Sequence, residues 1–346
     1  MTNYTEDVKI SENYRKNYLE SIDKTVESLC AEAESRRAEF VLGMKDNIPL
    51  YRSKYIEMLG YPMNSLSDSR KPPEVKREFV SSDDVCDIYR LTVNTFEEIK
   101  FYGLLFVPHG AVSAPLVICQ HGGWGTPELC SDMHGKNSYN NMVRRTVAEG
   151  AVVFAPQQLL WNIDKALDTA PAYGLPYNRS DIFRKLRHYG VNLISLEIYN
   201  IVRTIDYLAQ LDEVDEDRIR MMGLSYGGFY TLYTMAADTR IKVGYSSCFF
   251  NDRNRYDYFD WTWYNSANTF HDAEVACLCA DRHICIEVGK EDPVFKCETA
   301  LEEYERLRGY LDYLGLSENL LFNAWDGGHK ISMQDNTFGF FMTHLK

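Results

Sequence analysis

A serine flanked by glycines is the first feature of the sequence that could carry out chemistry. The segment Gly223-Leu-Ser-Tyr-Gly227 has the spacing G-x-S-x-G, in which a strand turns sharply into a helix and holds the serine oxygen above the sheet. Larger side chains two residues before or after the serine would collide in so tight a turn. A strand-like run ends at Met222 and a helix-like run begins at Gly228. The sequence therefore predicts that Ser225 is a nucleophile, rather than an ordinary serine of a glycine-rich turn.

One histidine occupies the place where a base for this serine would be needed. A serine hydroxyl is a weak nucleophile at neutral pH and depends on a neighbouring base. The segment Asp326-Gly-Gly-His329 follows the last strand-like run, Leu320 to Ala324. Its glycines allow a loop to bring the imidazole over the serine, and the other histidines lack this setting. We predict that His329 is the base.

An acidic residue is needed to orient the base and to stabilise the imidazolium. The segment Val288-Gly-Lys-Glu-Asp-Pro-Val294 follows a strand-like run and precedes His329. We predict that Asp292 is the acid, which gives the chain order serine, aspartate, histidine. The alternatives that the sequence leaves open are Glu291, Asp252 and Asp326, of which the last is expected to be structural.

A glycine-rich loop provides candidate donors for a developing oxyanion. The segment Gln120-His-Gly-Gly-Trp-Gly125 follows a short apolar run, and its glycines let the backbone approach a reacting carbonyl. We predict that the oxyanion hole is formed by the main-chain amide of Tyr226 together with that of Gly123 or Trp124. His121 is expected to be a structural prop. A phosphate cradle is the rival use, but no Lys-Ser/Thr pair of a P-loop follows.

Strand-like and helical runs alternate from about residue 75 to the end of the chain. Runs at 76–80, 88–93 and 101–107 predict an antiparallel beginning, and six short runs follow at 115–119, 151–155, 219–222, 243–248, 284–288 and 320–324. Helical stretches separate several of them, most clearly 192–210 with its apolar stripe. This alternation predicts a mostly parallel sheet with helices on both faces.

Residues 1–75 predict a helical extension to a catalytic domain of residues 76–346. Apolar side chains recur on one helical face at Leu19, Ile22, Val26 and Leu29. Gly43 and Pro49 interrupt the pattern, and a second short helix is expected over 51–58. We expect the extension to act as an arm that packs on the catalytic domain or on a second copy, which would make a homo-oligomer.

Two insertions rich in aromatic residues are predicted near the active site, at about 158–190 and 249–271. Both follow strand-like runs, so both should emerge at the carboxyl edge of the sheet, where open α/β sheets bind ligands. The predicted substrate-binding residues in them are Trp161, Tyr258, Trp261 and Trp263. The alternative use of the second insertion is packing, either as a lid or between subunits.

The composition of the chain indicates which kinds of molecule it is expected to bind. The formal net charge of −13 disfavours nucleic acid and anionic membranes, and no apolar run is long enough to span a bilayer. The amino-terminal segment lacks the apolar core of a secretory signal, and the nine cysteines lack zinc-like spacing. We therefore expect a cytoplasmic protein that needs no metal or organic cofactor and binds a small-molecule ester.

From about Val75 onward the chain resembles the α/β-hydrolase superfamily. The motifs that carry the resemblance are His121-Gly-Gly, Gly223-Leu-Ser-Tyr-Gly-Gly228, Gly289-Lys-Glu-Asp292 and Gly328-His329. The layout is most similar to the branch of acetyl xylan esterases and dienelactone hydrolase-like proteins. The resemblance implies the α/β-hydrolase fold, a Ser225–His329–Asp292 triad and an oxyanion hole. Dienelactone hydrolases proper use a cysteine nucleophile, and the serine here argues against that activity.

These features together predict a serine hydrolase that cleaves carboxylic esters, with short-chain (acetyl) esters of sugar-like or other small alcohols as the expected substrates. A second hypothesis is peptide or amide cleavage, because the nucleophile turn is also similar to that of prolyl-oligopeptidase-type peptidases. Those enzymes carry a large β-propeller, which some 75 residues cannot form. The third hypothesis is a non-catalytic binding protein on a hydrolase scaffold.

Overall fold

A nine-stranded sheet forms the centre of the molecule. In a computed structural model of the chain, the described residues are 3–133, 135, 137–159, 179–256 and 260–344. The strand order is β1-β2-β3-β5-β4-β6-β7-β8-β9. The contacts between β1, β2, β3 and β5 are antiparallel, and every later pairing is parallel. The predicted antiparallel beginning and parallel continuation are both confirmed.

The strands coincide with the runs expected from the sequence. Their bounds are β1 Val75–Ser82, β2 Cys86–Phe96, β3 Ile99–Pro108, β4 Ala114–Gln120, β5 Val152–Pro156, β6 Val214–Leu224, β7 Ile241–Ser247, β8 His283–Gly289 and β9 Leu320–Trp325. The central strands β4, β5 and β7 are almost wholly buried. They can be apolar along most of their length because helices cover the sheet on both sides.

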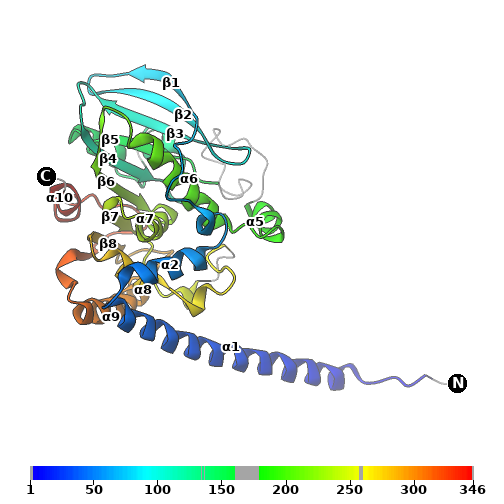
Figure 1. The fold of residues 1–346 in the computed structure, drawn as a ribbon. Helices are drawn as coiled ribbons and strands as arrows, with labels where there is room; N and C mark the ends of the chain where they lie inside the picture. The colour runs from blue at the N-terminus through cyan, green and yellow to red at the C-terminus, as the bar shows by residue number, and fades with distance from the viewer. Residues whose placement is uncertain (1–2, 134, 136, 160–178, 257–259, 345–346) are drawn as a thin grey trace.

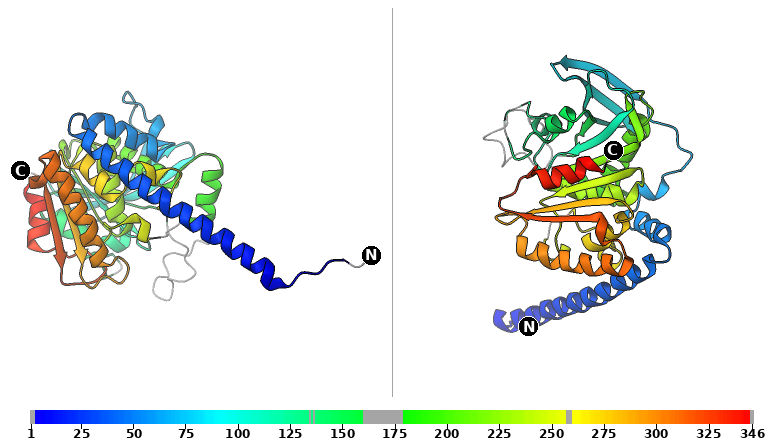
Figure 2. Two further views of the ribbon diagram at one scale, coloured as in Figure 1. Left: turned by 90° about the horizontal axis from the view of Figure 1, so that it is seen from below. Right: turned by 90° about the vertical axis from the view of Figure 1, so that its left-hand side faces the viewer.

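Helices form a layer on each face of the sheet (Figures 1 and 2). One face carries α1 Val8–Met44, α2 Ile48–Leu59, α6 Leu193–Leu208, α7 Tyr226–Ala237, α8 Asp272–Cys279 and α9 Cys297–Leu314. The other carries α3 Pro127–Cys130, α4 Met142–Ala148 and α10 Asp335–Thr343. The short helix α5, Arg179–His188, packs beside α6. Two apolar cores, one for each layer, hold the helices to the sheet.

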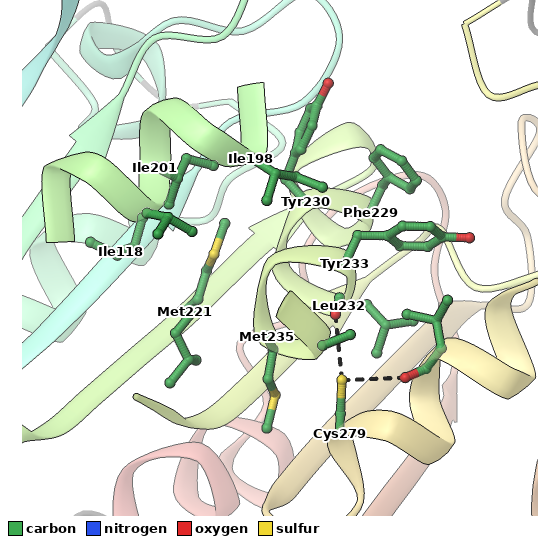
Figure 3. Close-up of a cluster of buried hydrophobic side chains, with 14 of the residues drawn as sticks. Ile118, Ile198, Ile201, Met221, Phe229, Tyr230, Leu232, Tyr233, Met235 and Cys279 are labelled. Carbon is green, nitrogen blue, oxygen red and sulfur yellow. Dashed lines mark hydrogen bonds between the residues drawn. The ribbon is translucent and has the colours of Figure 1, made fainter. Parts of the chain in front are cut away.

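The larger core lies under α6 and α7. Figure 3 shows Ile198 and Ile201 of α6 with Met221 of β6, and Tyr233 of α7 nearby, all of them buried. The thiol of Cys279 in α8 donates to the carbonyl of Leu232, 3.4 Å away. This packing fixes α7, the helix that begins directly after Ser225, against the sheet.

The N-terminal extension contains the two helices that the sequence predicted, with different bounds. α1 continues through Gly43 to Met44, and α2 begins at Ile48, three residues earlier than the sequence predicted. Pro49 starts this helix rather than breaking it, because the first turn of a helix needs no hydrogen bond from that nitrogen.

α1 packs on the molecule through its carboxyl-terminal end only. Ala33, Arg37, Val41 and Met44 are buried, whereas Leu19, Ile22, Val26 and Leu29 are exposed. Figures 1 and 2 show the amino-terminal part of α1 extending past the edge of the body. Packing on the catalytic domain is therefore confirmed for one end of the arm, and the homo-oligomer remains a prediction.

None of the described helices is both long enough and apolar enough to cross a membrane.

Candidate active site

Ser225 lies in a strained turn between β6 and α7. Its backbone has φ 59° and ψ −121°, a region that side-chain-bearing residues rarely adopt. The amide of Ser225 donates to the carbonyl of Ser247, 2.8 Å away, and its carbonyl accepts from the amide of Phe229 at 2.9 Å. The turn is thus held on both sides by main-chain hydrogen bonds, as the nucleophile motif predicts.

Two glycines make this turn sterically feasible. A Cβ atom at Gly223 would lie 2.5 Å from the carbonyl carbon of Gly227, and one at Gly227 would lie 2.1 Å from the oxygen of Gln120. Both contacts are with backbone, which cannot move aside as a flexible side chain would. The glycine spacing in the sequence therefore has a steric origin in the close approach of β4 and α7.

His329 is paired with Asp292. The His329 Nδ1 atom lies 2.8 Å from Asp292 Oδ2, and the carboxylate is buried while the imidazole is partly exposed. The other oxygen, Oδ1, accepts hydrogen bonds from the amides of Val294 at 2.7 Å and Phe295 at 3.0 Å. The ring of Phe295 stacks on the imidazole with centroids 5.8 Å apart. The carboxylate is thus fixed in position and can orient the ring.

The alternative acids have other partners. Asp326 is largely exposed and its Oδ1 lies 2.8 Å from Lys290 Nζ. Asp252 caps a short 3-10 helix by accepting from the amide of Asn254. No hydrogen bond between Glu291 and His329 is present in the described part of the chain. Of the four acids that the sequence offered, Asp292 is the one in contact with the histidine.

A buried glutamate on β8 supports the loop that carries His329. Glu287 Oε1 accepts from the amide of Ser332 and from the hydroxyl of Ser247, both at 2.8 Å. Its Oε2 accepts from the hydroxyl of Tyr245 at 2.9 Å and from that of Ser332. Burial raises the pKa of the Glu287 carboxyl. Sequence analysis missed this residue, although a charged residue inside the apolar run 284–288 is the signal that would have found it.

The serine and the histidine open into one cavity of about 380 Å³. Gly122, Gly123, Trp124 and Tyr226, which include all three predicted oxyanion residues, line it as well. Most of the remaining wall is apolar, with contributions from Leu129, Leu224, Val294, Phe295 and Trp261. The structure thus brings the predicted nucleophile, the predicted base and the glycine-rich loop to one concave surface. Such a surface is where substrates are usually bound.

His121 lies behind this loop and is fully buried. Its Nε2 atom lies 3.2 Å from the amide nitrogen of Gln158, which donates to it, and its Nδ1 lies 2.8 Å from the carbonyl oxygen of Gly122. Burial lowers the pKa of His121 to about 4, so the ring is neutral at pH 7. These contacts agree with the structural role expected for it.

The predicted substrate-binding residues do not all lie at the same place in the structure. Trp261 lines the cavity, whereas the indole nitrogen of Trp263 donates to the carbonyl of Met58 in α2, 3.0 Å away, and Trp263 is not in the wall of the cavity. Trp263 thus faces the N-terminal helices, because the chain after Trp261 turns back toward them, and its role in substrate binding stays a prediction. Trp161 and Tyr258 lie outside the described residues.

Cys248, Asp292 and His329 place possible metal-ligand atoms within 4.8 Å of one another. Burial raises the pKa of the Cys248 thiol to about 12, which disfavours the thiolate that a metal would need. His329 already pairs with Asp292 through its Nδ1 atom, 2.8 Å from Oδ2. The arrangement therefore fits an orienting carboxylate better than a metal centre.

Comparisons with known proteins agree with this geometry. A family model described as "Prolyl oligopeptidase family" matches residues 191–335, a stretch that includes Ser225, Asp292 and His329. The protein YtaP of Bacillus subtilis (strain 168), named as a candidate hydrolase, is 35% identical over 69 residues. These residues are 20% of this chain and 23% of YtaP. Quorum-quenching protein AidA of Acinetobacter baumannii (strain MDR-ZJ06) is 26% identical over 157 residues, 45% of this chain and 42% of AidA. The matches thus span less than half of either curated relative.

Among solved structures, acetyl xylan esterase 1 from Thermoanaerobacterium sp. JW/SL YS485 is similar with a TM-score of 0.55 and 18% identity. The likeness covers 87% of this chain and 94% of that one. With the strand order, the turn at Ser225 and the positions of the acid and the histidine, this establishes the α/β-hydrolase fold. The expected likeness to acetyl xylan esterases is confirmed at the level of the fold.

Proposed function

We propose that the chain is a serine hydrolase that cleaves carboxylic esters through an acyl-enzyme. The observation that carries the proposal is the shared cavity: Ser225 and His329 both line it, and Asp292 lies 2.8 Å behind the histidine. A nucleophile, a base and an orienting acid in this chain order are what acyl transfer requires. The solved esterase structures with this fold add support, although their likeness extends to the fold alone.

The mechanism follows from the roles of these side chains. Ser225 attacks the ester carbonyl carbon while His329 removes the hydroxyl proton, and Asp292 stabilises the imidazolium. The tetrahedral oxyanion is held by main-chain amides, for which Tyr226 and Gly123 or Trp124 are the candidates. The C–O bond to the alcohol breaks as His329 returns the proton to the leaving oxygen. Water then attacks the acyl-enzyme with the same base, and the acid is released.

We propose short-chain acyl groups, acetyl above all, on a sugar-like or other small alcohol. A cavity of about 380 Å³ lies at the small end of the range for ligand pockets, and its mostly apolar wall suits a short acyl chain. The aromatic face of Trp261 offers a surface for the alcohol. Only a small-molecule substrate is proposed as a partner at this site, and no cofactor takes part in these steps.

The test is hydrolysis of p-nitrophenyl acetate, butyrate and octanoate by the wild-type protein and by Ser225→Ala. We expect the acetate to be the best substrate and the substitution to lower kcat by at least about 10³-fold, because the residual rate comes from binding and the oxyanion hole alone. Labelling of Ser225 by a fluorophosphonate, located by mass spectrometry, is the second readout. Equal rates in the two proteins and no labelling of Ser225 would refute the proposal.

A second candidate is peptide or amide cleavage, which the family match over residues 191–335 favours. The same triad would attack an amide carbonyl, and the leaving group would be an amine. Parallel assays on glycyl-prolyl p-nitroanilide and p-nitrophenyl acetate separate the two. Rapid release from the anilide with none from the ester would replace the esterase proposal. The third hypothesis, a non-catalytic binding protein, predicts turnover of neither substrate and no fluorophosphonate labelling.

A further inference from the structure

Three charged side chains form a buried cluster beside the candidate active site. Arg179 Nη2 lies 3.0 Å from Glu197 Oε2, and Arg179 Nε lies 2.8 Å from Asp260 Oδ2. Their side chains are 5% exposed or less. Arg179 begins α5, Glu197 belongs to α6, and Asp260 lies in the second aromatic insertion. Burying such a cluster in a protein is costly and contributes little net stability, which points to a role in holding other groups in place.

One branch of the cluster leads to the residue after the nucleophile. The hydroxyl of Tyr226 donates to Asp260 Oδ1, 2.8 Å away, while the other oxygen of this carboxylate faces Arg179. The guanidinium also lies 5.5 Å from the centre of the Tyr226 ring. The side chain of Tyr226 is therefore held at both its ring and its hydroxyl. Its main-chain amide is the first candidate oxyanion donor.

A second branch leads to the glycine-rich loop. Arg179 Nη1 donates to the carbonyl of Leu159 at 2.6 Å, and Glu197 Oε1 accepts from the amide of Leu159 at 2.7 Å. The neighbouring side chain of Gln158 donates through Nε2 to the carbonyls of His121 at 2.9 Å and Gly122 at 3.0 Å. The cluster thus fixes the segment 158–159, which in turn holds the loop that carries Gly123 and Trp124.

We propose that Arg179, Glu197 and Asp260 are positioning residues that set the two halves of the oxyanion hole relative to each other. This inference rests on the proposed serine-hydrolase function and deepens it. The two halves come from segments about 100 residues apart, at the ends of β4 and β6, and each is tied to the same guanidinium. Arg179 and Asp260 belong to the two insertions, so the described parts of both insertions contribute to the support of the site.

A matched pair of substitutions on α7 tests the first branch. Tyr226→Phe removes the hydroxyl that binds Asp260. Tyr233→Phe removes a hydroxyl that donates to Asp272 Oδ1 at 3.0 Å, on the same helix and equally buried, but two turns away from Ser225. A purely structural role predicts the same behaviour for both variants. A positioning role predicts that only Tyr226→Phe affects the stabilisation of the oxyanion.

We expect Tyr226→Phe to lower kcat for p-nitrophenyl acetate by about 10- to 100-fold with KM changed less than about twofold, because a small misplacement of a donor affects the transition state more than the bound ester. Binding of a trifluoromethyl ketone, whose adduct with Ser225 carries an oxyanion, should weaken by a similar factor. Tyr233→Phe should stay within about twofold of wild type in both assays. Similar melting temperatures for the two variants would show that global stability is not the cause.

Asp260→Asn provides a second test that keeps the shape of the side chain. The amide oxygen can still accept from Tyr226, so we expect a smaller loss of kcat than in Asp260→Ala, which removes the acceptor. Equal kcat and equal ketone affinity in wild type, Tyr226→Phe and Asp260→Ala would overturn the inference. If the wild-type protein is also not labelled at Ser225 by a fluorophosphonate, the proposed function itself fails. Normal labelling with unchanged variants refutes only the positioning role.

Discussion

The carboxyl edge of the sheet and the amino-terminal part of α1 depart from the usual distribution of residues in opposite ways. At the edge, ionisable side chains such as Arg179, Asp260 and Asp292 are buried, each with a charged partner or hydrogen-bond donors. On α1, Leu19 is 58% exposed and Leu29 is 52% exposed. Buried polar groups and exposed apolar stripes are the informative exceptions in a folded protein.

The difference shows that side chains at the carboxyl edge are constrained by their buried partners, whereas those on the outer part of α1 are not. At the edge, each polar group has a fixed position, because leaving one unpaired inside the protein would cost about 1–3 kcal/mol. The outer part of α1 has no such internal constraint, and its apolar side chains contribute little to the folded monomer. Substitutions should therefore have large effects at the edge and small ones on the outer arm.

The largest expected effect at the edge comes from Asp292→Asn. An asparagine preserves the shape but cannot stabilise the imidazolium and favours the wrong tautomer of His329, so kcat/KM for p-nitrophenyl acetate should fall by about 10³- to 10⁴-fold. Asp326→Asn is the matched control, because Asp326 is exposed and pairs with Lys290. It should change kcat/KM less than about twofold. Comparable losses in the two variants would contradict the assignment of the acid.

An intermediate effect is expected on stability at low pH through His121. Burial lowers its pKa to about 4, against about 6.5 in the unfolded chain. Below pH 6.5 the unfolded chain therefore takes up a proton that the native protein does not. The contribution of His121 to the free energy of unfolding is therefore fully present above about pH 6.5, and it is lost as the pH falls toward 4.

The measurement is the free energy of urea unfolding at pH 7.5 and pH 4.5, for wild type and for His121→Gln. Between pH 7.5 and pH 4.5, His121 should account for about 2–3 kcal/mol of the decrease in the free energy of unfolding of the wild type. Other groups titrate in both proteins. The decrease in wild type minus the decrease in His121→Gln therefore gives the contribution of this histidine. A variant that loses as much stability as wild type would show that His121 is not held neutral in the native protein.

Sequence predicts the parts of this architecture that are encoded locally. Each of the nine strands contains a strand-like run that is visible in the sequence. The Ser225 turn needs glycines at fixed spacing because of the backbone contacts at Gly223 and Gly227. The histidine could be proposed from its place after the last strand. These features depend on residues that are near one another in the chain.

The remainder depends on contacts that the sequence does not display. Arg179 and Asp260 are 81 residues apart, and nothing in either segment indicates that they pair. Trp261 and Trp263 are equivalent in the sequence, yet one lines the cavity and the other contacts α2. The stripe on α1 was visible from its periodicity, which identifies the apolar face of a helix but not whether anything covers it.

The smallest expected effects lie on α1, where two valines allow a direct comparison. Val41 is fully buried against the body, and Val26 is 51% exposed on the outer part of the same helix. Val41→Ala should lower the free energy of unfolding by about 2 kcal/mol through lost burial and a small cavity. Val26→Ala should change it by less than about 0.5 kcal/mol. Both substitutions bring the same gain in helix propensity, so that contribution cancels in the comparison.

Urea unfolding in dilute solution measures this difference for the single chain. Repeating it at high protein concentration tests the proposed homo-oligomer, because association of the folded protein makes stability depend on concentration. If a second copy covers the outer stripe, the loss caused by Val26→Ala should grow with concentration while that of Val41→Ala stays nearly constant. Equal losses for the two valines in dilute solution would mean that the outer part of α1 is covered within the single chain, and the contrast with the carboxyl edge would no longer hold.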